Sequence, residues 1–127
     1  MSRYLVLFLV LISMIVSGQP YSSGDKKAVK LFEQAKLAYE GRLFTKSLQL
    51  LDEVLEKDSC FLEVYLLKSD IFQELDSVAL QVIAIEKALR LHPEKNPKLY
   101  YSLGNACFKS GQYQKAADAY RNYLQRV

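Results

Sequence analysis

Residues 99–124 read LYYSLGNACFKSGQYQKAADAYRNYL and carry two apolar stripes at helical spacing. The first stripe consists of Leu99, Leu103, Ala106 and Cys107, and the second of Tyr113, Ala116, Ala117, Tyr120 and Leu124. Residues at this spacing share one face of a helix. Gly111 separates the stripes, where a helix end favours a residue that tolerates a left-handed backbone. The stretch therefore predicts a helical hairpin.

The same layout occurs twice upstream, at steps of 34 and then 35 residues. Small residues recur as Ala35, Ser69 and Gly104, and bulky residues as Leu31, Tyr65 and Tyr100. The other matching series are Phe44, Val78 and Tyr113; Ser47, Gln81 and Ala116; Leu51, Ile85 and Tyr120; and Leu55, Leu89 and Leu124. A fixed period of this length is the signature of a helical repeat protein. Helices are expected near 26–40, 44–57, 61–75, 78–91, 97–110 and 113–126.

This period and pattern resemble the tetratricopeptide repeat (TPR) family. The unit at 97–127 matches best, with the pair Leu103-Gly104 and the turn at Gly111. The first unit departs from the pattern because Gly41 comes one place early, and the second because Asp76 replaces the turn glycine. The resemblance implies an all-α fold over residues 26–127. Three antiparallel helix–turn–helix repeats, about 28–61, 62–95 and 97–127, would stack as a right-handed TPR superhelix, an α-solenoid.

The amino-terminal residues have the composition of an export signal. Arg3 precedes an apolar run, Tyr4–Val16, which is short for a membrane span and typical of a signal-peptide core. We expect residues 1–18 to be a signal peptide cleaved after Gly18; an uncleaved membrane anchor is the alternative. Export would place the chain in the periplasm, at the outer membrane or outside the cell. Residues 19–25 are expected to form a polar, flexible linker, and Asp25 to cap the first helix.

The sequence offers little for catalysis, metal binding or nucleic-acid binding. The formal net charge is +3, and the basic residues form no stripe of the kind that nucleic acids require. His92 is the single histidine and has no partner at metal-ligand spacing. We therefore expect no catalytic residues, no metal and no cofactor. Cys107 is expected to be buried in a helix, well apart from Cys60, which would lie in a loop.

Binding of a protein or peptide is the function that the resemblance implies. In TPR proteins the first helix of each repeat lines the groove. The resemblance places this candidate peptide-binding groove at Phe32, Lys36, Tyr39, Leu66, Asp70, Gln73, Tyr101, Asn105 and Phe108. Its aromatic residues would either anchor an extended peptide or a partner helix, or pack against neighbouring helices. A known subclass grips a terminal carboxylate with Lys and Asn at two of these positions; this chain has Phe32 and Lys36 there.

The last expected helix carries an apolar face that no later helix of this sequence would cover. Its residues Tyr113, Ala117, Tyr120 and Leu124 form a candidate self-association face for a homo-oligomer. An export signal followed by three repeats also resembles the beginning of larger Bacteroidetes-type envelope proteins with TPR and outer-membrane-protein-A-like domains. The sequence thus predicts an exported scaffold module at the bacterial cell envelope. The alternative is a structural spacer, or the amino-terminal part, of a peptidoglycan-associated or outer-membrane-associated assembly.

Overall fold

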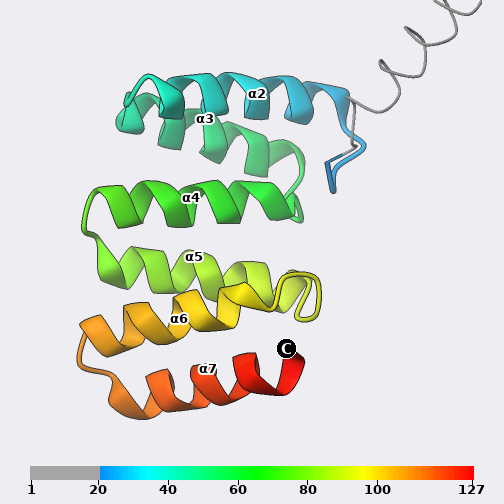
Figure 1. The fold of residues 1–127 in the computed structure, drawn as a ribbon. Coiled ribbons are helices and arrows are strands. Elements are labelled where there is room, and N and C mark those ends of the chain that lie inside the picture. The colour runs from blue at the N-terminus through cyan, green and yellow to red at the C-terminus, as the bar shows by residue number, and fades with distance from the viewer. Residues whose placement is uncertain (1–20) are drawn as a thin grey trace, which may run out of the picture.

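The computed structural model describes residues 21–127, which form six α-helices and no strand. The helices are α2 (Lys26–Glu40), α3 (Phe44–Lys57), α4 (Leu62–Glu74), α5 (Val78–Leu91), α6 (Lys98–Lys109) and α7 (Tyr113–Arg126). They lie one above another in chain order as three antiparallel hairpins (Figure 1). The expected helices are confirmed, with no end displaced by more than one residue. The predicted signal peptide, 1–18, lies outside the described residues.

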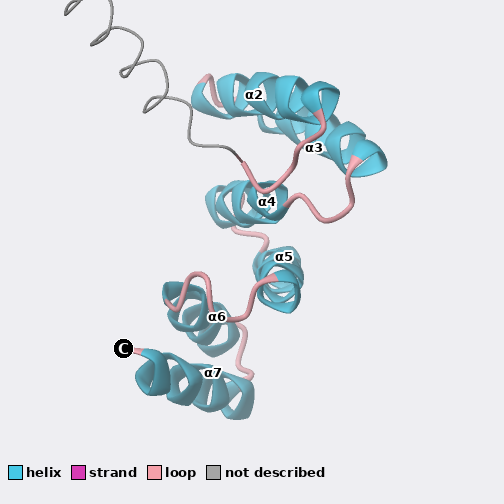
Figure 2. Ribbon diagram, turned by 90° about the vertical axis from the view of Figure 1, so that its right-hand side faces the viewer, coloured by secondary structure: helices cyan, strands magenta, loops and turns pink. Residues whose placement is uncertain are grey.

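Figure 2 shows the stack along its helices, with α2, α4 and α6 on one side and α3 and α5 on the other. We call the side with α2, α4 and α6 the first-helix side, because each of these is the first helix of its hairpin. Neighbouring hairpins touch through α3 and α4 and through α5 and α6. In residues 21–127, no helix has the length and apolar character needed to cross a membrane.

The three hairpin turns share one backbone conformation. Arg42, Asp76 and Gly111 have φ angles of 59°, 55° and 80°, and each directly follows the residue that caps its helix. The amide of the next residue then bonds back to a carbonyl five residues earlier, as in Gln112 N–H to Cys107 O at 2.8 Å. This is the hydrogen-bonding pattern of a glycine-type helix end. Only the third turn has glycine at the left-handed position, as predicted.

Small residues permit each hairpin's two helices to approach closely. In the first hairpin the Ser47 hydroxyl donates to the buried Ala35 carbonyl at 2.8 Å. In the third, a Cβ added at Gly104 would overlap the Tyr120 ring. The Tyr120 hydroxyl is also held, because it donates to Asn105 Oδ1 at 2.7 Å. The predicted small positions are therefore contact points between helices.

The core is a chain of apolar clusters that continues from one hairpin into the next. Leu51, Val54, Phe61 and Ile71 are fully buried where the first hairpin meets α4. Further along, Leu55 packs in one cluster with Leu62 and Tyr65, and Leu89 in another with Leu99 and Tyr100. Cys107 is buried, Cys60 is exposed and both are free thiols, in agreement with the sequence-based expectation.

The chain immediately before α2 differs from the predicted flexible linker. Asp25 does cap α2, because its carboxylate accepts the Ala28 amide at 2.9 Å. Residues 21–23, however, pack against the hairpins: Ser23 is 7% exposed, and Tyr21 and Ser22 bond to side chains of α2 and α4. The polar composition of this segment suggested mobility, but its hydroxyl groups find specific partners.

The contact between Gly104 and Tyr120 leads to the first prediction. Gly104→Ala should destabilise the protein, because overpacking a close contact costs about 1–3 kcal/mol while the gain in helix propensity is at most about 1 kcal/mol. Urea unfolding followed by circular dichroism measures the difference.

Gly24→Ala is the matched control, because its Cβ would meet nothing within 4 Å and we expect little change. Replacing Tyr120 by Leu in the Gly104→Ala background should recover part of the loss. A Gly104→Ala protein as stable as the original would contradict the close contact.

Candidate functional site

The open part of the first-helix side lies between α4 and α6. One cavity of about 300 Å³ is lined by residues that include Leu66, Asp70 and Lys98. A second cavity of about 130 Å³ adjoins it and is lined by residues that include Asn105 and Lys109. Both cavities are bordered by Gln73, Gln81 and Ser102, so they form one continuous depression. We call it the α4–α6 cleft.

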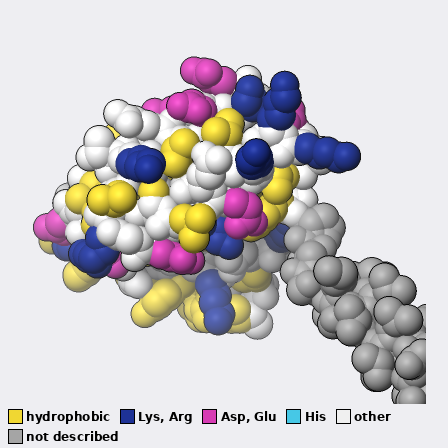
Figure 3. Space-filling view, turned by 90° about the horizontal axis from the view of Figure 1, so that it is seen from above, with side chains coloured by type: hydrophobic (Ala, Val, Ile, Leu, Met, Phe, Trp, Pro, Cys, Tyr) yellow, Lys and Arg dark blue, Asp and Glu magenta, His cyan; other side chains and the backbone are white. Residues whose placement is uncertain are grey.

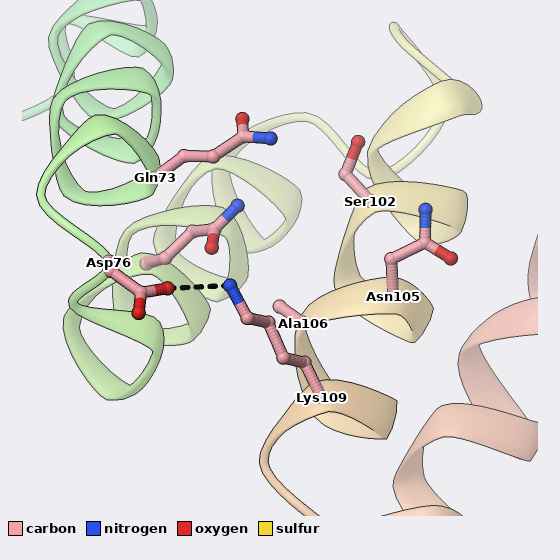
Figure 4. A pocket seen from close by; sticks show the side chains of 7 residues that line it. Gln73, Asp76, Ser102, Asn105, Ala106 and Lys109 are labelled. Atoms are coloured by element: carbon pink, nitrogen blue, oxygen red, sulfur yellow. Dashed lines mark hydrogen bonds and ion pairs between the residues drawn. The ribbon is translucent and has the colours of Figure 1, made fainter.

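Helical spacing explains which side chains line this cleft. Leu66, Asp70 and Gln73 follow one face of α4, and Lys98, Ser102, Asn105 and Lys109 follow one face of α6. Gln81 reaches the cleft from α5, behind these two helices. In Figure 4 the Gln73 amide on α4 lies opposite Ser102 and Asn105 on α6. The walls are therefore mainly polar.

An ion pair joins the two walls at one end. Lys109 Nζ lies 2.5 Å from Asp76 Oδ1, which belongs to the turn between α4 and α5 (Figure 4). Both side chains are more than half exposed, so the pair contributes little to the free energy of folding. Its position matters more, because Asp76 and Lys109 both line the smaller of the two cavities.

Amide side chains in the cleft provide both donors and acceptors. A Gln or Asn side chain offers a carbonyl oxygen with two lone pairs and an amino group with two N–H donors. Asn105 uses one lone pair to accept the Tyr120 hydroxyl at 2.7 Å, which leaves its amino group free to donate into the cleft. Gln73 and Gln81 make no hydrogen bond to the residues that the structure describes. Such groups match the alternating N–H and C=O groups of an extended peptide.

Asp70 places a negative charge in the cleft. Within residues 21–127 it has no ion-pair partner. Burial raises the pKa of its carboxyl group, and the nearby Glu74 carboxylate raises this pKa further. Burial raises the pKa of the Tyr39 hydroxyl as well, with smaller contributions from Asp70 and Glu74. The carboxylates of Asp70 and Glu74 thus act on the Tyr39 hydroxyl near the end of α2, where Arg42 opposes them.

The structure brings together four of the nine predicted groove residues. Leu66, Asp70, Gln73 and Asn105 all line the α4–α6 cleft. Sequence reasoning missed Gln81 and Ser102. In the repeat alignment Gln81 is a large polar residue at a position where the other repeats have a small one. It belongs to the second helix of its hairpin, whereas the predicted groove used only first helices. Ser102 lies one residue beyond the predicted position of Tyr101.

Phe32 and Lys36 do not line an open groove, which corrects their prediction. Phe32 is 4% exposed because the Tyr21 ring covers it, with the two ring centres 5.0 Å apart. Lys36 donates to the Tyr21 hydroxyl at 3.3 Å and lies over the Tyr21 ring. Both residues therefore contact the chain's own amino-terminal segment.

The three remaining aromatic residues pack against second helices, and no continuous aromatic strip forms. Tyr39 lies 5.9 Å from Phe44 of α3, measured between ring centres. Tyr101 packs on Tyr120 and Tyr123 of α7, and Phe108 meets Tyr113 edge to face. Tyr101 and Phe108 nevertheless remain 50% and 60% exposed. They border the surface next to the cleft rather than the cleft itself.

The predicted self-association face is only partly exposed. Tyr113 and Leu124 are 64% and 68% exposed, whereas Ala117 is half-buried. Tyr120 points into the third hairpin against Gly104, so it belongs to that hairpin's internal contact. At the opposite end of the stack, hydrophobic side chains appear in small groups between charged ones (Figure 3).

Among the described residues, no group of three or more His, Cys, Asp or Glu side chains is arranged to hold a metal ion. No buried side-chain nitrogen or oxygen atom in residues 21–127 lacks a hydrogen-bond partner. The polar groups available to a ligand in this part of the chain therefore lie at the surface, and the α4–α6 cleft is where they converge.

Stacked helical hairpins of this kind define a helical-repeat solenoid. Comparison of the chain with known families and solved structures shows which type it is. Residues 97–126 match the family model described as Tetratricopeptide repeat. The crystal structure of MamA superposes with a TM-score of 0.69 and 18% identity, covering 90% of this chain and 63% of MamA. The Arabidopsis OM64 TPR domain has a TM-score of 0.68 and 22% identity, over 80% of this chain and 83% of that domain. The fold is therefore a TPR-type α-solenoid.

Two of the similar structures contain a bound peptide. The first TPR of Spaghetti (RPAP3), bound to the HSP90 peptide SRMEEVD, superposes with a TM-score of 0.69 and 17% identity. The superposition covers 80% of this chain and 79% of that one. No curated protein is similar enough in sequence to count as a relative. At this level of identity the solved structures establish the fold.

The raised pKa of Asp70 predicts how stability depends on pH. The folded state holds the Asp70 proton more tightly than the unfolded state does, so ionisation of this carboxyl disfavours folding as pH rises. Asp70→Asn should therefore raise the urea midpoint at about pH 7 and have no effect below about pH 3, where the unfolded carboxyl is also protonated. Because the side chain is partly exposed, solvent screening keeps the gain small.

Asp52→Asn serves as the control for this experiment. Asp52 accepts an ion pair from Lys68 at 3.1 Å, so removing its charge should bring no gain at neutral pH. A lower urea midpoint for Asp70→Asn at about pH 7 would show that the carboxylate is satisfied in the folded protein, contrary to this prediction.

Proposed function

We propose that the chain is an exported scaffold module that binds a partner protein through an extended peptide held in the α4–α6 cleft. The observation that carries this proposal is the convergence of Gln73, Gln81, Ser102 and Asn105 on one open depression. TPR-type solenoids are interaction scaffolds, and the similar RPAP3 domain holds a peptide. In this cleft, amide side chains would pair with the ligand's backbone, and Leu66 would supply an apolar contact.

The Asp70 carboxylate disfavours an acidic ligand residue beside it, while Lys98 of α6 also lines the cleft. The peptide in the RPAP3 structure, SRMEEVD, contains three acidic residues. Here Asp70 lies in the cleft, and Lys109, one of the cleft's cations, is already paired with Asp76. An acidic side chain next to Asp70 would meet like-charge repulsion. We therefore propose a ligand that places a neutral or basic residue at this point.

Export to the bacterial cell envelope is also part of this proposal, and its support is the amino-terminal sequence. Arg3 and the apolar run that follows it match the design of a signal peptide, and Gly18 offers a small residue for cleavage. A scaffold module at the envelope would meet its partner after secretion.

A structural spacer is the second candidate function, and Leu124 favours it. Leu55 and Leu89, its counterparts in the first two repeats, pack against the first helix of the next hairpin, whereas Leu124 is 68% exposed. A spacer would bury this residue against another helix and would leave the α4–α6 cleft without a ligand. Peptide binding in the cleft therefore distinguishes the two functions.

The export proposal predicts the start of the mature chain. When the full-length protein is produced in a Gram-negative host, amino-terminal sequencing of the periplasmic protein should give Gln19 as the first residue. Gly18→Arg is the matched change, because a large charged residue at the cleavage position should prevent processing. A chain that keeps Met1 and stays in the cytoplasm would contradict export.

The binding proposal predicts that blocking the cleft abolishes ligand capture. Random peptides displayed on phage would be selected on the unaltered protein, and their affinities measured by fluorescence anisotropy. Ser102→Arg should weaken binding by roughly tenfold or more, because the long side chain fills the space shared by both cavities.

Gln49→Arg adds the same side chain at an exposed position of α3 and should leave the affinity unchanged. Gln73→Ala, which removes one amide without adding bulk, should weaken binding by a smaller factor. Failure to select any peptide, or equal binding by the Ser102→Arg and Gln49→Arg proteins, would reject the cleft as the site.

A further inference from the structure

The segment before α2 lies against the first-helix side of the first hairpin. Figure 1 shows that it leaves the start of α2 and runs toward the start of α4. The Tyr21 ring packs edge to face on Phe32, with the centres 5.0 Å apart, and lies 5.8 Å from Phe61. Its hydroxyl donates to the Glu33 carboxylate and accepts from Lys36 Nζ at 3.3 Å. The Tyr21 ring therefore packs on apolar rings, and charged side chains of α2 hold its hydroxyl.

Ser22 adds a second set of contacts, with the beginning of α4. Its backbone N–H donates to Glu63 Oε1 at 3.0 Å, and its hydroxyl donates to Glu63 Oε2 at 2.5 Å. The same hydroxyl oxygen accepts the Leu62 amide at 2.9 Å. The residue before α4, Phe61, has no polar side chain to cap this helix. Ser22 therefore acts as a helix cap from a distant part of the sequence.

These contacts have the features of peptide recognition. The aromatic ring of Tyr21 packs against other apolar rings. The Glu63 carboxylate accepts hydrogen bonds from both the backbone N–H and the hydroxyl of the next residue, Ser22. Segment 21–23 has no helical or strand structure of its own, and α2 and α4 supply its partners. Its partners belong to α2 and the beginning of α4, whereas the cleft lies between α4 and α6.

We propose that the surface formed by Phe32, Phe61, Lys36 and Glu63 is a second peptide-binding site, specific for a Tyr-Ser pair, which the chain's own Tyr21-Ser22 occupies. The matching partner is an extended segment that carries a tyrosine followed by a serine. Because the occupant is tethered to α2, its effective concentration is in the millimolar range. A free peptide with modest affinity is therefore excluded until residues 21–23 are released.

The test uses a labelled synthetic peptide with the sequence of residues 19–25, QPYSSGD, and measures its binding by fluorescence anisotropy. In the full chain, Tyr21→Ala combined with Ser22→Ala empties the site. This released protein should bind QPYSSGD at least about tenfold more tightly than the unaltered protein does, because the tethered competitor is gone. A peptide in which the Tyr and its adjacent Ser are replaced by Ala is the control and should not bind.

Adding Glu63→Ala to the released protein should abolish the gained binding. If the released protein does not bind QPYSSGD, or if the unaltered protein binds it equally well, the proposed site is wrong. Because emptying the site could also unfold α4, the single variant Ser22→Ala provides an independent measurement. Hydrogen exchange of the Leu62 amide should accelerate by about tenfold or more, since its acceptor is lost. An unchanged exchange rate at Leu62 would overturn the contact on which the proposal rests.

Discussion

The close approach of two helices within each hairpin is the contact on which the rest of the structure depends. Where Gly104 meets the Tyr120 ring, and where Ser47 reaches the Ala35 carbonyl, a larger side chain would push the helices apart. Closely paired helices bring their other apolar residues into one layer, and that layer packs on the next hairpin. The stack then places α4 beside α6 at a spacing that leaves a polar cleft between them. The close helix contacts thus hold together the hairpins that border this cleft.

The first-helix side is divided into two unequal parts. Across α2 and α4, Tyr21 and Ser22 already use the aromatic and charged groups of the surface. Across α4 and α6, the amides of Gln73 and Gln81 and the carboxylate of Asp70 are not paired within the described residues. A ligand that enters this cleft would therefore meet polar side chains and charges of both signs, Asp70 and Lys98 among them. The aromatic part becomes available only when the amino-terminal segment moves.

The fold was predictable because the information that specifies it is periodic. A small residue recurring at Ala35, Ser69 and Gly104 marks the helix contacts, and the left-handed turns follow at the same steps. The first turn follows the period rather than the residue type: Gly41 comes one place early, and the left-handed residue is Arg42, in register with Asp76 and Gly111.

The candidate site was only partly predictable, because its geometry depends on contacts that do not repeat. Asp70 and Asn105 follow from helical spacing on the first helices. Phe32 could not be assigned correctly from the pattern, since its cover, Tyr21, lies in a non-helical segment outside the repeats. Tyr101 packs against Tyr123 of α7, because aromatic side chains pair across the third hairpin. This contact depends on which residues α7 carries, and they differ between repeats. The amino-terminal contacts are equally invisible to a repeat alignment.

The division of the first-helix side can be measured directly by the accessibility of three aromatic rings. A soluble gadolinium chelate relaxes protons at the protein surface, and the ring protons of Phe32, Tyr101 and Phe108 can be followed together by NMR. With exposed fractions of 4%, 50% and 60%, Phe32 should be protected while Tyr101 and Phe108 are strongly relaxed. If Phe32 were relaxed as strongly as Tyr101, the first-helix side would be open along its whole length, which would contradict its division into a covered and an open part.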